Sequence, residues 1–505
     1  RMGEAYYHDD DELDHTMWEI RAHSEPSLLQ IRSPVLAVPK DCSGGEGRLC
    51  VTDAFSRLKR TASHSSAGAG GGLLEVQKRG CTFRIHRRIL LEGGSLVRLS
   101  GLAFPLLAVL LALGSLPGLA SENISNPVEG NRTTAESLQT MLEERWIDYG
   151  SDYPNFPGGI ALLVVSAEDS YFASCGIEGE PTENTHFRAA SITKTLTAAG
   201  ILLLQQRGLL NIEDTVDSNI PGRSEPYLPD TPQYAIPYGD SITIRQLLEH
   251  RAGVFDISNY VVPADSEAPY AGQNYLGYIL PQDFEHTVTF DELAGVIASN
   301  QLSIAPPGTG YSYSDTGYSL LGKIIEQVSG ESFGDFITKN LLLPNGLYDS
   351  SLPYLGTDQT LPFPFTIGYD YYGGEFEPVS NDNPSWQVAN GNLVTTPADL
   401  AEWGKRLYTG KAGLESEYVK MMMDVKRLSD TGGYGLGCEY IEGIGYGHSG
   451  AVSGYLSMMS YDPDRDLSTV VFANVMNWDD LTNQMMFFRG LIRQVRTTLR
   501  DRSEM

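Results

Sequence analysis

The chain has 505 residues, of which 41% are hydrophobic and 20% are charged. This is an ordinary globular composition, and it excludes a chain that is disordered throughout. The net charge is −28, and residues 1–120 hold 14 Lys and Arg against 13 Asp and Glu, so residues 121–505 carry −29. Such an acidic body repels phosphate backbones and anionic lipid, which argues against nucleic acid as a partner.

The first part of the chain resembles an exported protein with an unusual extension. Residues 1–96 show no sustained periodicity, so we expect them to be disordered or to be an extension from a mis-assigned start, with translation beginning at Val97. Residues 97–120 have the layout of a secretory signal, with Arg98, an apolar run over 101–116 and a small-x-small cleavage site ending at Ala120. An uncleaved membrane anchor over 98–119 is the alternative. The protein is therefore expected to be secreted, periplasmic or attached to the cell surface.

A polar linker over residues 121–135 leads into the first regular elements. Thr133 and Glu136 match a capping box, and the helix that follows carries an apolar stripe at Leu138, Met141, Leu142 and Trp146. Residues 159–165 and 170–174 predict two strands of a hairpin with a polar turn between them.

The rest of the chain predicts helices in the middle and strands at the end. A helix runs from Ser191 to about residue 208, and Pro- and Gly-punctuated helices follow over 241–250, 290–300 and 318–328. A further helix begins at 396–397, and after it come strands over 454–461 and 467–475 and a last amphipathic helix over 480–499. This order predicts one domain over 136–500, with a sheet subdomain from about 136–210 and 397–500 and a helical insertion over about 211–396.

The segment that carries most chemistry is Ser191-Ile192-Thr193-Lys194. Residues three apart share a helix face, so the Lys194 amine would lie beside the Ser191 oxygen and could accept its proton if desolvation kept the amine neutral. Ser and Lys are common residues, and taken alone this spacing is equally that of a capped surface helix.

Two later motifs accompany it, Tyr313-Ser314-Asp315 and His448-Ser449-Gly450. In this order the three boxes resemble the serine β-lactamase and penicillin-binding protein superfamily, particularly its class C, DD-carboxypeptidase, D-aminopeptidase and esterase branch. That family shows Ser-x-x-Lys, then Tyr-x-Asn, then Lys-Thr-Gly or His-x-Gly. The phrases at 247–253 and 307–312 also resemble it, and the similarity runs from roughly residue 158 to 493. It implies an α+β fold, with an antiparallel β-sheet flanked by helices and an inserted, mainly helical domain.

The resemblance implies a catalytic role for four side chains. Ser191 would attack a carbonyl carbon and become acylated, and Lys194 would accept its proton or lower neighbouring pKa values. Tyr313 would shuttle a proton between the serine oxygen and the leaving group, a task worth on the order of 100 to 10,000-fold in rate. His448 would line the cleft, binding a substrate carboxylate when protonated or donating a hydrogen bond when neutral.

Further positions are implied as substrate-binding. The backbone amides of Ser191 and Ala451 would form an oxyanion hole beside Gly450. Asp315 occupies the place of the usual Asn, and a carboxylate donates no hydrogen bond unless it is protonated. Asp315 would therefore hold Lys194 as an ammonium and repel a carbonyl oxygen, which weighs against β-lactam turnover.

These features together predict an exported serine hydrolase that works through an acyl-enzyme with no metal and no cofactor. A small peptide of D-amino acids, a β-lactam and an ester all fit as substrates. The alternative is a binder of penicillin or cell-wall peptides that is acylated without turnover, or that Asp315 has silenced. A metal site lacks its ligands, because the nine His are scattered and no His-Glu-x-x-His occurs.

Other patterns are weaker. Residues 447–451 nearly spell the nucleophile elbow of α/β-hydrolases, but those enzymes need a histidine downstream and none follows His448. Residues 317–323 approximate a phosphate loop by chance, since Ile324 replaces the Ser or Thr. Cys175 and Cys438 are expected to be buried thiols, with a disulfide as the alternative. The aromatic stretch over 353–377 either forms a wall of the cleft or covers core.

Overall fold

A computed structural model describes residues 75–78, 81–84 and 133–503 of the chain. The predicted signal or anchor, the start at Val97 and most of the linker over 121–135 lie outside these residues. Within the stretch expected to be disordered, β1 (Glu75–Lys78) and β2 (Cys81–Arg84) form an antiparallel hairpin that sets Val76 opposite Phe83. No helix in the described ranges is both long enough and apolar enough to cross a membrane.

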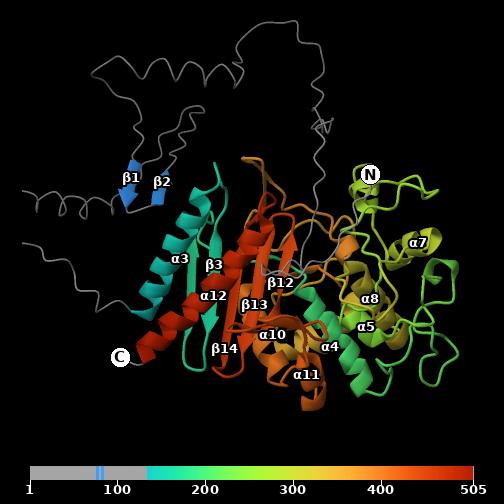
Figure 1. The fold of residues 1–505 in the computed structure, drawn as a ribbon. Helices are drawn as coiled ribbons and strands as arrows, with labels where there is room; N and C mark the ends of the chain where they lie inside the picture. Colours follow the sequence, from blue (N-terminus) through green and yellow to red (C-terminus); the bar gives the residue numbers. More distant parts are fainter. Residues whose placement is uncertain (1–74, 79–80, 85–132, 504–505) are drawn as a thin grey trace, which may run out of the picture. The chain divides into compact units, whose positions relative to one another are not determined.

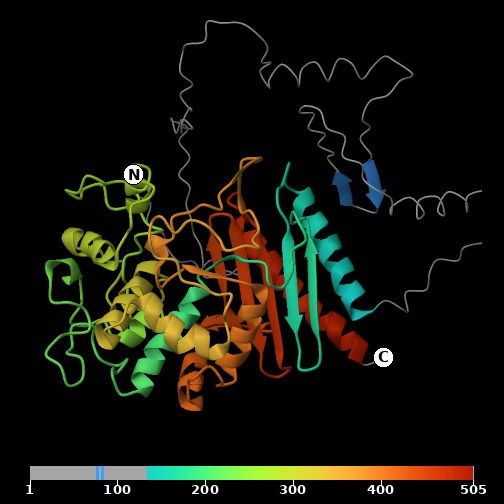
Figure 2. The same cartoon turned by 180° about the vertical axis from the view of Figure 1, so that it is seen from behind.

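The main unit, which holds all the described residues from 133 to 503, is built on an eight-stranded antiparallel sheet. The strand order is β4-β3-β14-β13-β12-β11-β10-β9, so the hairpin near residue 160 joins strands from the end of the chain. In chain order these strands are β3 (Ile160–Val165), β4 (Ser170–Cys175), β9 (Lys426–Ser429), β10 (Gly432–Tyr434), β11 (Glu439–Ile441), β12 (Gly445–Val452), β13 (Tyr455–Asp462) and β14 (Leu467–Ala473). Figure 2 shows β3 and β4, in teal, beside the red strands of the chain's end.

Both faces of the central strands are buried, and each face contributes to a different hydrophobic cluster. Ile160 and Leu162 of β3 belong to one cluster, and Ala161 and Leu163 belong to the other. Successive side chains of a strand point to opposite faces, so this near-continuous apolar run serves both clusters. The sheet is therefore the middle layer of the unit.

Helices α3 (Thr134–Ser151) and α12 (Leu481–Ser503) cover one face of the sheet (Figure 1). The predicted capping box is present, since the Thr133 hydroxyl accepts from the Glu136 amide and the Glu136 carboxylate accepts from the Thr133 amide. The predicted stripe of α3 is buried, with Leu142 fully so. The first helix is thus confirmed in both its start and its buried face.

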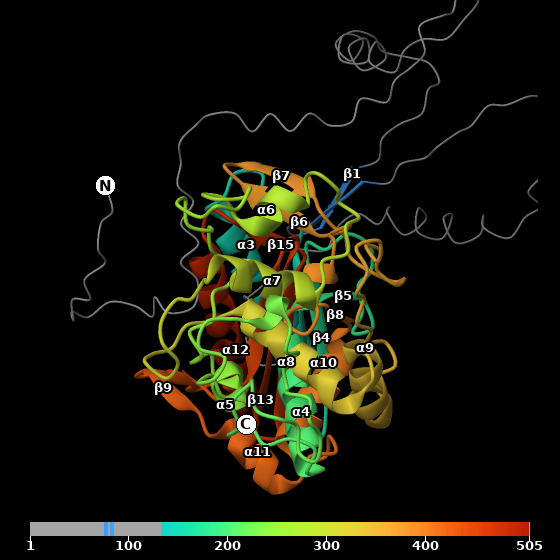
Figure 3. The same ribbon diagram turned by 90° about the vertical axis from the view of Figure 1, so that its right-hand side faces the viewer.

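The opposite face carries α10 (Pro397–Tyr408) and the larger cluster, which extends into the helical region. Figure 3 shows α4, α7 and α8 gathered on one side of the molecule. The helices of this part are α4 (Thr193–Gln206), α5 (Ile244–Leu248), α6 (Tyr275–Ile279), α7 (Phe290–Asn300), α8 (Asp315–Ser329), α9 (Phe333–Ile337) and α11 (Ser416–Met423), with short helical turns η1 (Pro232–Tyr234), η2 (Thr338–Leu342), η3 (Leu343–Asn345) and η4 (Ser385–Gln387).

Two small sheets complete the unit. The strands β5 (Phe187–Ala190) and β8 (Leu393–Thr395) pair antiparallel, and Phe187 stacks on Phe472 of the central sheet with ring centroids 4.2 Å apart. The strands β6 (Tyr369–Tyr372) and β7 (Glu375–Pro378) form a hairpin beside β15 (Val475–Asn477). The β5–β8 pair matters most for function, because β5 leads directly into Ser191.

The predicted α+β fold is confirmed, and most predicted elements lie within a few residues of their place. The helix expected over 241–250 is shorter, since it spans only Ile244–Leu248. The strand expected over 467–475 ends at Ala473, and a separate short strand begins at Val475. Strands β5 to β12 were not predicted individually, because they are short or glycine-rich and carry no clear alternation.

Candidate active site

Ser191 lies at the junction of β5 and α4, two residues before the helix begins. Ala190, just before it, has a left-handed φ of 49°, which costs a residue with a Cβ roughly 1–2 kcal/mol. The Lys194 amide donates to the Ser191 carbonyl over 2.9 Å, which starts the helix. The sharp turn thus fixes Ser191, which is 4% exposed, at the amino end of α4.

Lys194 is fully buried and its ammonium nitrogen has a partner in each of three segments. Lys194 Nζ lies 3.0 Å from Ser191 Oγ, 2.6 Å from Asp315 Oδ1 and 2.7 Å from the backbone oxygen of Asn390. The amine therefore lies beside the serine oxygen, at the distance that the spacing of the first box predicts. Burial lowers the pKa of Lys194, and the charge and hydrogen bond of Asp315 oppose this shift.

Tyr313 lies against the same amine, with Lys194 Nζ 4.9 Å from the centre of its ring. Burial raises the pKa of the Tyr313 phenol well above its usual value, and the negative charge of Asp315 adds to the rise. A hydrogen bond with Ser191 lowers this pKa but does not reverse the shift. The phenol is therefore neutral at physiological pH and keeps its proton available for donation.

Asp315 opens α8 and joins two groups of partners. Its Oδ1 binds Lys194, while its Oδ2 accepts from Ser258 Oγ at 3.0 Å and from Asn259 Nδ2 at 3.3 Å. Its backbone amide donates to Asp256 Oδ2 over 3.0 Å. Asp256 is fully buried, and burial together with the charge of Asp315 raises its pKa to about 6. The site thus holds two carboxylates beside one amine.

His448 lies on β12 and is 2% exposed. Its Nδ1 lies 2.6 Å from the carbonyl oxygen of Ser449, and its Nε2 lies 2.9 Å from the hydroxyl of Tyr434. Burial lowers the pKa of His448, as does the charge of Lys194, while Glu439 opposes the shift. A neutral imidazole with both nitrogens in use offers no positive charge to a substrate carboxylate.

Gly450 and Ala451 follow on the same strand, next to the segment that carries the nucleophile. A Cβ on Gly450 would meet the carbonyl oxygen of Ala189 at 2.1 Å, so β12 and β5 are in direct contact. Ser457 Oγ on the neighbouring strand donates to the same carbonyl over 3.1 Å. The structure therefore brings all three sequence boxes to one place, and it places Ala451 on the strand that passes Ser191.

Several residues of the site were assigned no role from the sequence. His250 and Tyr434 contact Tyr313 and His448, Asp256 supports Asp315, and Asn390 supplies a carbonyl to Lys194. His250 lies in the family-like phrase at 247–253, and Asp256 is an acidic residue inside the apolar run Val254-Phe255-Asp256-Ile257. A charge in such a run must find a buried partner, and this partner lies some 60 residues away at Asp315.

The competing sequence patterns do not form sites. Residues 447–451 lie inside β12 and not at a turn from strand to helix, so they form no nucleophile elbow. Residues 317–323 lie inside α8, which confirms that the phosphate-loop match arose by chance. No disulfide joins Cys175 to Cys438; Cys438 is buried as expected and Cys175 is partly exposed. Within the described ranges, no group of three or more His, Cys, Asp or Glu side chains is arranged to hold a metal ion.

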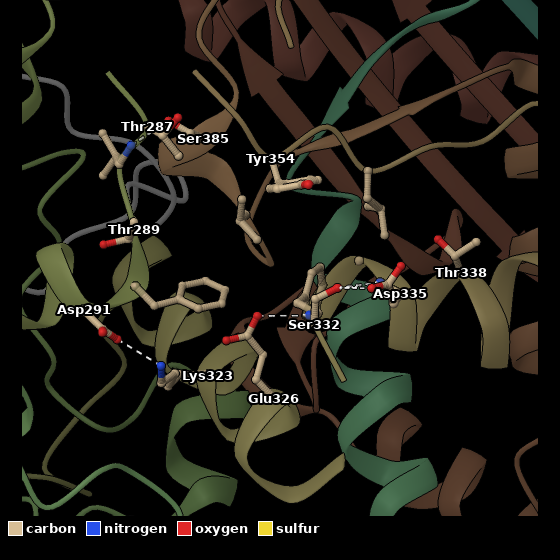
Figure 4. Close-up of a pocket in the computed structure, with 16 residues that line it drawn as sticks. Thr287, Thr289, Asp291, Lys323, Glu326, Ser332, Asp335, Thr338, Tyr354 and Ser385 are labelled. Atoms are coloured by element: carbon tan, nitrogen blue, oxygen red, sulfur yellow. Dashed lines mark hydrogen bonds and ion pairs between the residues drawn. The ribbon is translucent and has the colours of Figure 1, made fainter. Parts of the chain in front are cut away.

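The aromatic stretch over 353–377 borders two cavities. Phe365 and Ile367 line a cavity of about 580 Å³ together with Asp382 and with Ser453, which follows β12. Tyr354 lines another of about 570 Å³ beside Glu326 and Phe333 (Figure 4). The stretch therefore forms cavity walls, although Tyr371 within it is buried.

Comparison with known proteins identifies the family. A profile of the Beta-lactamase family matches residues 144–485, well over half of the chain. The chain belongs to the Beta-lactamase family. This assignment agrees with the three boxes and with the place where they meet.

Two curated relatives illustrate the range of this family. Penicillin-binding protein 4* of Bacillus subtilis (strain 168) is 27% identical over 338 residues, which cover 63% of this chain and 68% of that protein. Protein flp of Staphylococcus aureus (strain N315) is 24% identical over 359 residues, which cover 68% of this chain and 64% of that protein. The chain therefore spans about two thirds of the length of these relatives.

Solved structures of two amide-hydrolysing enzymes share the fold. A D-stereospecific amidohydrolase from Streptomyces sp. is 25% identical with a TM-score of 0.57, covering 68% of this chain and 94% of its own. The D-amino acid amidase from Ochrobactrum anthropi SV3, solved with L-phenylalanine amide, is 21% identical with a TM-score of 0.58, covering 73% and 99%. The β-lactamase and transpeptidase-like arrangement of sheet and helices is thus shared along almost the whole length of both.

Proposed function

We propose that this chain is a serine hydrolase that forms an acyl-enzyme at Ser191. The observation that carries the proposal is the contact of Lys194 Nζ with Ser191 Oγ at 3.0 Å in a fully buried setting. Membership of the Beta-lactamase family and the likeness to an amidohydrolase support it.

The partners of Lys194 suit a general base. A neutral amine can accept the Ser191 proton on its lone pair while its own two N–H groups donate to Asp315 and to the Asn390 carbonyl. After it takes the proton, the ammonium has three donors and the same three acceptors. The site therefore stabilises the charge that the reaction creates without rearranging.

Tyr313 is suited to the second proton transfer. Its phenol is neutral and lies beside Ser191 and Lys194, so it can donate to the leaving group as the acyl-enzyme forms and be reprotonated through Lys194. We assign the stabilisation of the oxyanion to the backbone amides of Ser191 and Ala451. Water would then release the acyl group by the reverse route.

The charges of the site favour a small amide or ester whose recognised end carries no carboxylate. Asp315, Asp256 and Glu439 are buried beside a single amine, and both nitrogens of His448 are occupied by Tyr434 and Ser449. A free carboxylate, such as that of penicillin or of a peptide terminus, would meet an excess of negative charge. The similar proteins from Streptomyces sp. and Ochrobactrum anthropi SV3 are a D-stereospecific amidohydrolase and a D-amino acid amidase, which agrees with an amide of a D-amino acid as substrate.

A substrate panel tests the proposal. Phenylalanine amides of both hands, an acylated D-alanyl-D-alanine peptide, a chromogenic cephalosporin and a p-nitrophenyl ester would be assayed with wild type and with Ser191→Ala. We expect turnover of the amides or the ester and little turnover of the peptide and the cephalosporin, which both carry a free carboxylate. Ser191→Ala should turn over none of them. Turnover that survives in Ser191→Ala would contradict the proposal.

A binder without turnover is the second candidate, and Asp315 is the observation that favours it. At 2.6 Å from Lys194, a carboxylate stabilises the ammonium, which cannot accept the serine proton. Burst kinetics separate the candidates: an enzyme continues to release product, a binder that is acylated without turnover releases one product per chain and then stops, and a site silenced by Asp315 releases none.

A further inference from the structure

His250 holds the second box from both sides, although the proposed chemistry assigns it no role. Its backbone oxygen accepts from the Ser312 amide over 2.7 Å, and its Nδ1 accepts from the Ser314 amide over 3.1 Å. Its ring packs on the ring of Tyr313 between them, with the centroids 4.1 Å apart. The side chain is 2% exposed, and His250 has a left-handed φ of 55°, unusual for a residue with a Cβ.

The other nitrogen of His250 continues a chain of hydrogen bonds to the third box. His250 Nε2 lies 3.2 Å from the hydroxyl of Tyr434, and that hydroxyl lies 2.9 Å from His448 Nε2. His448 Nδ1 lies 2.6 Å from the carbonyl oxygen of Ser449. This series of hydrogen bonds thus links the segment that carries Tyr313 to the strand that carries Gly450 and Ala451.

The groups at the two ends of this series, the Ser314 amide and the Ser449 carbonyl, decide which atom donates in every hydrogen bond between them. An amide can only donate, so Ser314 leaves His250 Nδ1 without a proton and puts the ring proton on Nε2, which donates to Tyr434. A carbonyl can only accept, so His448 carries its proton on Nδ1 and its Nε2 accepts from Tyr434. The Tyr434 hydroxyl accepts once and donates once. Each member is satisfied when both rings are neutral.

The surroundings support this neutral arrangement. Burial lowers the pKa of both imidazoles, and for each the charge of Lys194 adds to the shift. Glu439 faces His448 with Oε1 3.8 Å from Nδ1, but the same carboxylate accepts from Ser449 Oγ at 2.9 Å. Burial raises the pKa of Tyr434 well above its usual value, so its hydroxyl keeps its proton.

We propose that His250 and Tyr434 are positioning residues that tie the two walls of the cleft together, holding the Tyr313 ring and fixing the Nδ1–H tautomer of His448. This inference rests on the proposed function, because it assigns Tyr313 and the strand of His448 to the reaction. Since correct placement of reacting groups contributes much of an enzyme's rate, loosening this tie slows acylation while leaving Ser191 and Lys194 in contact.

Tyr434→Phe tests the middle of this hydrogen-bond series, because it removes the hydroxyl that joins His250 to His448 and keeps the aromatic ring. The control is Tyr227→Phe: Tyr227 is fully buried and its hydroxyl bonds Asn211 and Asp214 and no residue of the site. We expect Tyr434→Phe to lower kcat/KM for the best substrate of the panel by on the order of 10- to 100-fold, through kcat more than KM. Tyr227→Phe should match wild type. Equal activity of Tyr434→Phe and Tyr227→Phe would overturn the proposal.

His250→Asn tests the first link. Asn can accept from Ser314 and tolerates a left-handed φ, but it loses the ring that packs on Tyr313 and the donor to Tyr434. In a double-mutant cycle, the loss of kcat/KM in the double variant His250→Asn and Tyr434→Phe should be close to the larger of the two single losses, because both substitutions break the same series of hydrogen bonds. Fully additive losses would show two independent effects and reject the tie.

A spectroscopic measurement separates this inference from the proposed function. In protein labelled with ¹⁵N histidine, with His448→Gln to assign the signal, His448 should show a protonated Nδ1 and an unprotonated Nε2. Tyr434→Phe should shift the Nε2 resonance, and Tyr227→Phe should not. A His448 ring protonated on Nε2 in wild type would refute the proposed hydrogen-bond series even if the enzyme is active. A wild type that is not acylated would refute the proposed function and leave this readout intact.

Discussion

At the scale of single residues, two opposed influences decide the charge of Lys194. Burial favours the neutral amine, and Asp315 favours the ammonium. Base catalysis needs the neutral form, so acylation should rise with pH as Lys194 loses its proton and should level off above its pKa. Because Asp315 raises the pKa of Lys194, it moves the rise of the acylation rate towards alkaline pH.

Asp315→Asn should shift that range in the opposite direction. Without the carboxylate, only the charges of Asp256 and Glu439 still oppose the effect of burial on Lys194, so its pKa falls further and the rising limb of the acylation profile moves to lower pH. An amide at this position can also donate to a substrate carbonyl, so reaction with a cephalosporin should increase. The measurement is the acylation rate of both proteins against pH with an ester and a cephalosporin.

The control for this prediction is another pair of Asp and Lys. Asp291 Oδ1 lies 3.0 Å from Lys323 Nζ, on an exposed edge of the cavity shown in Figure 4. Asp291→Asn should leave the pH profile unchanged. A profile of Asp315→Asn that coincides with wild type would mean that Asp315 does not set the charge of Lys194.

Residue types and their spacing predicted the four side chains expected to be catalytic, but not the residues that pack against them and bind them. Ser191 and Lys194 are one helical turn apart, so local geometry alone brings them together. The sequence around His250 and Tyr434 names no partner for either residue, and the apolar run around Asp256 indicates that it needs a buried partner but not which one. Their roles arise from packing between distant segments, which no local pattern encodes.

At the scale of elements, the contact of β12 with β5 positions the nucleophile. Gly450 leaves room for the carbonyl of Ala189, and the chain turns at Ala190 directly before Ser191. β12 was not predicted as a strand because its run Gly-Tyr-Gly-His-Ser-Gly-Ala-Val has little β-propensity. The close approach of two backbones explains the glycine.

Gly450→Ala should therefore disrupt the site. Its Cβ would meet the Ala189 oxygen at 2.1 Å, so β5 must move, and with it Ser191. We expect a loss of acylation on the order of 100-fold, since small displacements of reacting groups cost about that much. The measurement is the labelling rate by an ester or a penicillin.

Two further variants keep this prediction testable if Gly450→Ala folds poorly. Ser457→Ala adds no atoms between the strands; it removes the hydrogen bond to the Ala189 oxygen and a longer one, at 3.4 Å, to the Gly450 oxygen, and it should give a smaller loss in the same direction. Gly295→Ala, in α7, meets only the Gln233 side chain at 3.6 Å and should remain fully active. Full activity of Gly450→Ala would show that β5 is free to shift without harm.

The helix α12 belongs to the other face of the sheet and should affect stability alone. Phe488 is fully buried there, and Phe488→Ala should lower the free energy of unfolding by about 3–5 kcal/mol. Met486→Ala, on the same helix at a residue that is 40% exposed, should change it by less than about 0.5 kcal/mol. Denaturant unfolding measures both, and kcat at low temperature should stay that of wild type. A large fall in kcat for Phe488→Ala would mean that the sheet transmits strain to the cleft.

At the scale of the whole molecule, one sheet joins segments from both ends of the main unit. Strands at the front and the back of the sequence predicted this arrangement, because neither group could bury its faces alone. The strand order was not predictable, since it depends on which apolar edges meet in space. Each central strand contributes to both hydrophobic clusters, so the loss of either cluster removes support from the other.

The net charge of −28 acts on this whole unit and leads to the last prediction. Like charges repel more in the compact state than in an expanded chain, so self-repulsion lowers stability at neutral pH. Raising NaCl from about 0.01 M to about 0.15 M shortens the screening length from about 30 Å to about 8 Å, and the Tm should rise. Near pH 4.6, where the net charge of the sequence vanishes, the same salt should have much less effect. Calorimetric scans at the two pH values measure this difference. A Tm at neutral pH that does not rise with salt would mean that exposed ion pairs such as Lys339–Glu331, which salt weakens, outweigh the repulsion between the remaining acidic groups.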